Sequence, residues 1–155
     1  MDSRLSGKKI LIAVSPDTAE RMLRILEGHE VAVMRTVEDA EAELQAHEYA
    51  AIVLGASFDE SRMFEVLRLV RIYECNKTTP VICIVGVDSN LSDVAIEGLD
   101  HAVKAMLANA FLNLQKFPDD EAGNARVRRI IDYLILIDGD IHGGFKEVHG
   151  ENEHK

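Results

Sequence analysis

Tryptophan is absent from this sequence of 155 residues, and only two cysteines, Cys75 and Cys83, are present. Two cysteines without CxxC spacing exclude a disulfide framework and the common zinc motifs, so both are expected to be free thiols. Long apolar runs are also absent: the longest, such as residues 133–137, are far shorter than the ~20 residues that a membrane span requires. The polar start of the chain, residues 1–9, shows no signal peptide. These absences predict a cytoplasmic protein without a membrane anchor.

The sequence also lacks the glycine-rich loops that hold nucleotide phosphates, since neither GxGxxG nor GxxxxGK[ST] occurs. No spacing suggests a catalytic triad or a set of metal ligands, so we expect no enzyme activity, no cofactor and no metal. Positive charge is scarce: 17 basic residues stand against 27 acidic ones, for a formal net charge of −10. Such a chain repels a phosphate backbone, which argues against nucleic acid as a partner. A local basic cluster, Arg126, Arg128 and Arg129, is interpreted as a solvated helix face.

What is present is a regular alternation of short apolar runs and amphipathic stretches. Five runs have the continuous apolar character of strands that are covered on both faces of a sheet. They lie at residues 10–14, 31–34, 49–54, 81–85 and 110–114. Between them, apolar residues recur at helical spacing, with a start signal at Ser15-Pro16-Asp17 and a stop signal at Gly28.

Five helices are expected from the amphipathic stretches. In the first, the apolar side consists of Ala19, Met22, Leu23 and Leu26. The second begins at Thr36, which with Asp39 resembles a capping box, and the third carries its apolar stripe over 63–70. The fourth is expected over 91–108, and the fifth begins at 118.

Five βα units in strict alternation define the fold class. Parallel strands need crossover connections, and these are right-handed in nearly all proteins. The pattern therefore predicts an α/β fold, a doubly wound, flavodoxin-like parallel sheet of five strands in the order 2-1-3-4-5. One domain is expected over 1–137. Residues 138–155 hold four glycines and three histidines but few apolar residues, so they are expected to form a flexible polar tail.

With this order of elements, the chain resembles the receiver domain of two-component response regulators over residues 8–137. Segments similar to the family's strands one, three, four and five, and to its third helix, occur in order and at nearly family spacing. They lie at residues 8–12, 49–54, 79–82, 108–112 and 64–68. The resemblance implies a domain that accepts a phosphoryl group on an aspartate at the carboxyl end of strand three. It also implies Mg²⁺-binding acids, a hydroxyl residue and a lysine at neighbouring strand ends.

The positions that match these functional residues carry other side chains. The Mg²⁺-binding acids fall on Val14 and Ser15, and the phosphoacceptor falls on Gly55. The hydroxyl residue falls on Val85, and the lysine falls on Leu114. Glycine offers no nucleophile, and a hard dication needs carboxylate oxygens. We therefore expect a degenerate pocket that neither binds Mg²⁺ nor becomes phosphorylated.

A few nearby residues leave alternatives open. Lys116, two residues beyond the matched lysine position, replaces that lysine only if the loop is rearranged. Asp17 and Asp59 are residual acids near the same crevice; they are interpreted as helix N-terminal acids, with a relocated weak metal site as the alternative. On strand five, Phe111 occupies a position that is aromatic in the family.

The last helix suggests a contact surface. Its consecutive apolar residues 134–137 point all round a helix, so some of them must find cover outside the domain unless the helix ends early. Receiver domains often associate through their fourth helix, fifth strand and fifth helix. The resemblance thus makes Phe111, Ile131, Leu134 and Ile135 candidate interface residues.

Two functions are consistent with these observations. The first is a phosphorylation-independent protein–protein interaction module in bacterial signalling, acting on a signalling partner or as a homodimer. The second is a sensor of a small ligand that binds in the crevice at the carboxyl ends of the strands. A closed pocket of roughly 300 Å³ or more would favour the sensor, and a filled crevice would favour the interaction module.

Overall fold

A single parallel sheet forms the centre of the structure, a computed structural model that describes residues 8–139. Its strands are β1 (Ile10–Ala13), β2 (Val31–Val33), β3 (Ala51–Gly55), β4 (Val81–Val85) and β5 (Ala110–Asn113). Their order across the sheet is β2-β1-β3-β4-β5, and all four pairings are parallel. The predicted fold class and strand order are confirmed.

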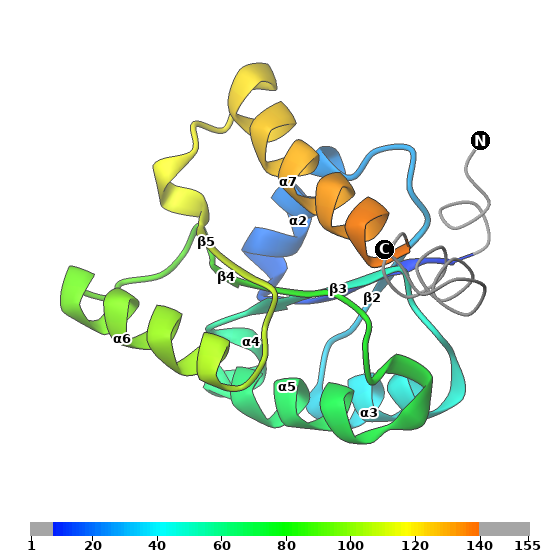
Figure 1. Cartoon of the computed structure of the whole chain (residues 1–155). Helices are drawn as coiled ribbons and strands as arrows, with labels where there is room; N and C mark the ends of the chain where they lie inside the picture. The colour runs from blue at the N-terminus through cyan, green and yellow to red at the C-terminus, as the bar shows by residue number, and fades with distance from the viewer. Residues whose placement is uncertain (1–7, 140–155) are drawn as a thin grey trace, which may run out of the picture.

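Helices cover both faces of the sheet (Figure 1). On one face lie α2 (Pro16–Ile25) and α7 (Glu121–Gly139), and on the other lie α3 (Val37–Ala46), α5 (Met63–Ile72) and α6 (Asp93–Ala105). Shorter turns are α4 (Phe58–Ser61), η1 (Glu74–Asn76) and η2 (Leu114–Lys116). The five predicted helices correspond to α2, α3, α5, α6 and α7, whereas α4 was not predicted.

The ends of two helices differ from the prediction. Helix α6 is shorter than the expected 91–108, and α7 begins at Glu121 instead of 118 because Asp120 accepts a hydrogen bond from the Gly123 amide. The apolar residues 134–137 lie inside α7, so this helix does not end early. It continues two residues past the expected domain boundary at 137. The rest of the expected tail, 140–155, lies outside the described residues.

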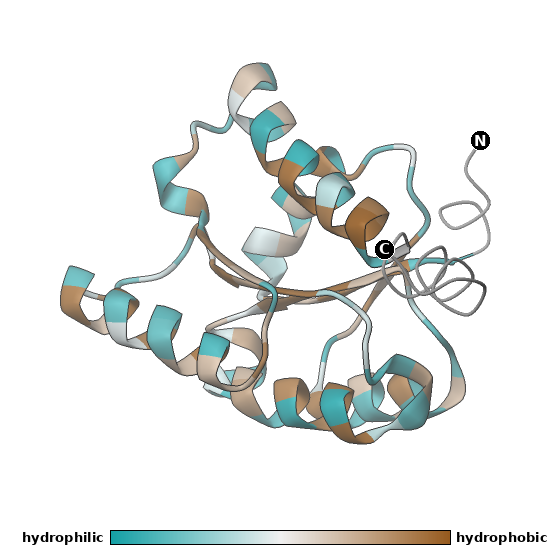
Figure 2. Ribbon diagram, in the orientation of Figure 1, coloured by the Kyte–Doolittle hydropathy of each residue, from teal (hydrophilic) through white to brown (hydrophobic). Residues whose placement is uncertain are grey.

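Two hydrophobic clusters form the core, one on each face of the sheet. Alternate residues of β1 divide between them, with Leu11 on the side of α3 and α5 and Ile12 on the side of α2 and α7. This explains the continuous apolar runs, because both faces of the central strands are covered, as Figure 2 shows. The edge strands β2 and β5 are only partly buried. Among residues 8–139, no helix combines the length and the apolar character needed to cross a bilayer.

Candidate functional site at the carboxyl ends of the strands

The five matched positions come together at one edge of the sheet. Val14 and Ser15 follow β1, Gly55 ends β3, Val85 ends β4 and Leu114 directly follows β5. The strand registers place these ends side by side. All five residues are buried. The site is therefore built from residues that the sequence analysis named, and it is covered.

Val14 occupies the space beside Gly55. A Cβ atom built on Gly55 would lie 3.0 Å from Cγ1 of Val14 and 3.2 Å from its Cα. Both distances are shorter than ordinary van der Waals contact, so even the first atom of a longer side chain at position 55 is crowded. The crevice at this point is filled by a valine.

A small polar network lies next to this packing. The Ser15 hydroxyl donates to Asp88 Oδ1 over 3.1 Å and lies 3.2 Å from the Thr18 hydroxyl oxygen. Thr18 in turn accepts a hydrogen bond from the backbone amide of Val87. Ser15 occupies the N-cap position of α2, as predicted, but its side chain makes no capping bond and turns to Asp88 instead. Thr18 and Asp88 were not predicted as site residues, because nothing in their spacing distinguishes them.

The network ties the β4–α6 loop to the rest of the domain. Gly86 makes the close approach possible, since a Cβ there would lie 2.2 Å from the Thr18 hydroxyl oxygen. On the other side of the loop, Gln115 Nε2 donates to the backbone carbonyls of Gly86 and Ser89. The loop is thus attached both to the start of α2 and to η2, so it closes over the strand ends.

The two residual acids have different surroundings. Asp17 is exposed in the first turn of α2. Asp59 accepts the backbone amide of Val37 over 2.8 Å and the guanidinium of Arg62 over 3.0 Å, so it stabilises the N-terminus of α3. In the part of the chain from 8 to 139, no three His, Cys, Asp or Glu side chains converge as metal ligands would. Lys116 is exposed on η2 and forms no ion pair within that part.

Helix α4 is a left-handed turn. Asp59, Glu60 and Ser61 have φ values of 47°, 57° and 67°. This conformation costs about 1–2 kcal/mol for each residue that carries a Cβ. The turn is held by the two contacts of Asp59, by the hydrogen bond from the Arg62 amide to the Phe58 carbonyl, and by the burial of Phe58. It is the strained element nearest to the strand ends.

Replacing Glu60 with glycine is expected to stabilise the protein. Glu60 is exposed and makes no hydrogen bond or ion pair in the described chain, so the change removes only backbone strain. The relief of backbone strain exceeds the cost of the extra conformational entropy that glycine has in the unfolded chain. We therefore expect the free energy of unfolding, measured by urea denaturation, to rise by about 0.5–1 kcal/mol. The control is Glu97→Gly in the right-handed helix α6, which is expected to lose about 1 kcal/mol. A loss in both variants would contradict the assigned strain.

A buried arginine holds the connection between β5 and α7. Arg21 has a side chain that is 4% exposed. Its guanidinium donates to the backbone carbonyls of Leu114, Phe117 and Pro118 and to the Asn124 side chain, over 2.8–3.1 Å. The predicted apolar side of α2 is therefore rotated, since Leu23 is 44% exposed and Arg21 is buried.

Neither cysteine provides a nucleophile at the site. Cys83 lies within β4, and its burial raises the pKa of the thiol to about 12. A thiol with that pKa is almost fully protonated near neutral pH, so Cys83 is inert. Cys75 is exposed on η1. Both are free thiols, as expected.

The candidate interface residues lie mostly inside the domain. Ile131 and Ile135 are buried in the core, and Phe111 and Leu134 are partly buried and packed against it. The first two are therefore not available at the surface. The apolar residues that α7 does expose lie on its opposite side, because successive helical residues differ by 100°.

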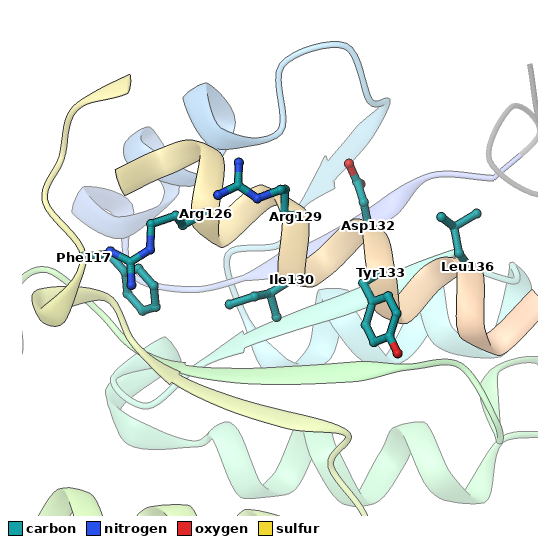
Figure 3. A pocket seen from close by; sticks show the side chains of 7 residues that line it. All are labelled: Phe117, Arg126, Arg129, Ile130, Asp132, Tyr133 and Leu136. Carbon is teal, nitrogen blue, oxygen red and sulfur yellow. The ribbon is translucent and has the colours of Figure 1, made fainter. Parts of the chain in front are cut away.

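An open hollow of about 670 Å³ lies along that opposite side of α7 (Figure 3). We call it the α7 groove; its lining consists of Phe117, Arg126, Arg129, Ile130, Asp132, Tyr133 and Leu136. Tyr133 is 63% exposed and Leu136 is 40% exposed. An apolar hollow with an aromatic ring and arginines has the composition of a protein-binding surface.

Comparisons with known proteins identify the fold. No protein-family model matches the chain, and no curated protein matches it. Among solved structures, a response regulator from Hahella chejuensis is 20% identical with a TM-score of 0.65, over 84% of this chain and 97% of that one. The receiver domain of a sensor histidine kinase from Pseudomonas aeruginosa, with a magnesium ion in its active-site cleft, is 19% identical with a TM-score of 0.63, over 84% and 98%.

A third similar structure carries a different description. An adenylate cyclase from Rhodopirellula baltica is 16% identical with a TM-score of 0.67, over 94% of this chain and 98% of that chain. At these identities the likeness concerns the fold. The chain has the fold of a receiver domain.

Proposed function

We propose that this chain is a receiver-like domain of bacterial two-component signalling that works by protein–protein contact and is not phosphorylated. One observation carries the proposal: Val14 packs against Gly55 at the strand end where the resemblance places the phosphoacceptor aspartate. The receiver fold supports the signalling role. The filled crevice supports independence from phosphate.

The chemistry of phosphoryl transfer explains why this packing is decisive. The reaction needs a carboxylate nucleophile, a divalent cation held by one or two further carboxylates, and positive charge near the transferred group. Val14, Ser15 and Gly55 supply none of these. Asp88 brings a carboxylate to the edge of the crevice, and its Oδ1 atom accepts a hydrogen bond from Ser15. Nothing at these positions compensates the charge of a phosphoryl donor.

Incubation with Mg²⁺ and a small-molecule phosphodonor, or with fluoroberyllate, is therefore expected to leave the protein unmodified. Intact mass spectrometry measures the phosphoryl adduct, and thermal unfolding with fluoroberyllate measures non-covalent binding. A phosphorylatable receiver domain treated in parallel is the positive control. A stoichiometric adduct on any carboxylate of the crevice, Asp88 included, would end the proposal.

The alternative function, a small-ligand sensor in the crevice, has less support. Val14, Val85 and Leu114 are at most 4% exposed, so a ligand would have to displace core side chains. The ties of the β4–α6 loop through Asp88 and Gln115 would also have to break. We therefore favour the interaction module.

We place the contact surface on the side formed by α6, β5 and α7. Besides the α7 groove on α7, helix α6 exposes Val94, which is 80% accessible. Asp93 and Glu97 are exposed on α6, and Arg126 and Arg129 are exposed on α7. In a two-fold symmetric pair, α6 of each copy faces α7 of the other, so opposite charges would meet twice. This pattern supports a second copy of the chain as a partner.

Replacing Val94 with serine is expected to weaken self-association about tenfold or more, because both copies lose an apolar contact. Sedimentation equilibrium at high protein concentration measures the effect. The control is Leu23→Ser, which removes an apolar residue from the exposed side of α2 and should leave the association constant unchanged. Equal loss in both variants would place the interface elsewhere.

A further inference from the structure

The two ends of the α7 groove differ in chemical character. Tyr133 and Leu136 lie toward the end of α7, close to Gly139, the last residue described. Arg126 lies at the other end of the groove, beside the ring of Phe117 (Figure 3). Ten residues separate Leu136 from Arg126, which corresponds to roughly 15 Å along a helix. The groove is therefore apolar near the point where the chain leaves α7 and cationic farther away.

Arg126 and Arg129 form the cationic end of the groove. Arg126 stacks on Phe117 with its guanidinium carbon 4.9 Å from the ring centroid. Arg129 is exposed and has no carboxylate partner among residues 8–139. Asp132, the carboxylate in the lining, pairs with His29 and Arg128. On a chain with a net charge of −10, this end is suited to an acidic group.

The amino-acid sequence that follows α7 carries both apolar and acidic residues. Phe145 and Val148 stand before Glu151 and Glu153, while Glu147 lies between the two apolar residues and Asp140 opens the segment. The pair Gly143-Gly144 stands before them, where the chain can reverse direction. At about 3.3 Å per extended residue, five residues suffice to follow the groove back to Arg126.

We propose that residues 140–155 bind in the α7 groove of their own chain. Phe145 and Val148 then contact the apolar end of the groove. Glu151 and Glu153 lie near its arginines. A segment joined directly to α7 has a high effective concentration at the groove, so it competes with a second copy or another partner. The proposal rests on the proposed function in taking this face as a contact surface, and it adds a means of regulating access to it.

The rate at which a tyrosine-acylating reagent modifies Tyr133 tests the proposal. The full chain is used at a concentration where sedimentation shows a monomer. Wild type is compared with the double variant Phe145→Ser/Val148→Ser, whose changes lie outside the described domain. We expect Tyr133 to react severalfold more slowly in wild type. Tyr49, which is 4% exposed, is the internal reference for folding.

Charge reversal tests the other end of the groove. The variant Glu151→Lys/Glu153→Lys is expected to accelerate the labelling of Tyr133, and so is Arg126→Glu/Arg129→Glu. Combining all four changes restores the opposite charges and should slow the labelling again. Rates equal to wild type in every variant would refute the proposal.

A second copy or a foreign partner is a distinguishable outcome. Protection of Tyr133 that grows with protein concentration, and persists in Phe145→Ser/Val148→Ser, would assign the groove to a second copy and refute binding of the chain's own segment. Tyr133 labelling does not depend on the phosphodonor result, so either proposal can fail while the other stands.

Discussion

Replacing Gly123 with alanine is expected to destabilise the protein strongly. A Cβ at this position would lie 1.9 Å from the carbonyl oxygen of Pro118 and 2.9 Å from its carbonyl carbon. Both contacts are with backbone atoms, which cannot rotate away as a side chain would. The connection between β5 and α7 would have to move, and it is fixed by Arg21. We expect a loss of at least about 3 kcal/mol in the free energy of unfolding, at the upper end of overpacking effects.

Gly98 provides the matched control, because it is also a glycine within a helix. A Cβ at Gly98 meets no atom within 4 Å. Gly98→Ala is expected to stabilise the protein by about 0.5–1 kcal/mol, since alanine is the better helix former. Urea denaturation of both variants measures the difference. A Gly123→Ala protein as stable as wild type would show that Pro118 does not approach α7 as described.

The second large effect is expected for Arg21→Met. Methionine fills much of the volume but donates no hydrogen bond, so the carbonyls of Phe117 and Pro118 lose the Arg21 guanidinium, and the Leu114 carbonyl keeps only the Phe117 amide. A buried acceptor without a partner costs about 1–3 kcal/mol. Some of these carbonyls can reach water after a local shift, so we expect a total loss of about 3–5 kcal/mol in unfolding free energy.

Arg24→Met is the corresponding change on the exposed side of the same helix. Arg24 pairs with Asp119 over 2.6 Å, but its side chain is 53% exposed. An exposed ion pair is worth about 0–1 kcal/mol, so only a small loss is expected. Similar losses for Arg21→Met and Arg24→Met would contradict the role given to burial. The apparent melting temperature and the urea midpoint should both be lower for Arg21→Met than for Arg24→Met.

The fold could be predicted because it depends on a pattern repeated five times. Each apolar run marks a strand that is covered on both faces, and each amphipathic stretch marks a crossover helix, so an error in one element leaves the others intact. Helix ends were less well predicted. Helix α7 begins at Glu121 and not at the predicted residue 118, because the side chain of Asp120 caps it. The proline at 118 had suggested an earlier start.

The candidate site could be predicted in position but not in detail. Strand order alone brings Val14, Gly55 and Val85 to one edge. The partners that complete the site, Asp88 and Arg21, come from a loop and from a helix face that periodicity assigned to solvent. Their roles depend on tertiary hydrogen bonds. Such contacts leave no periodic signal in a single sequence.

The left-handed turn illustrates a second limit. Glycine is the residue expected at positive φ, yet Asp59, Glu60 and Ser61 adopt it. Local preference favours another conformation for all three residues. The surrounding contacts, above all the bond from Asp59 to the N-terminus of α3, override that preference. A sequence rule based on local preference misses this kind of element.

The contact between Val14 and Gly55 constrains how this chain could change over generations. Aspartate at position 55 would meet Val14 before its carboxylate reached any partner, and that buried charge would be penalised at once. A side chain larger than glycine at position 55 therefore requires a smaller residue at position 14, so the two positions can change only together.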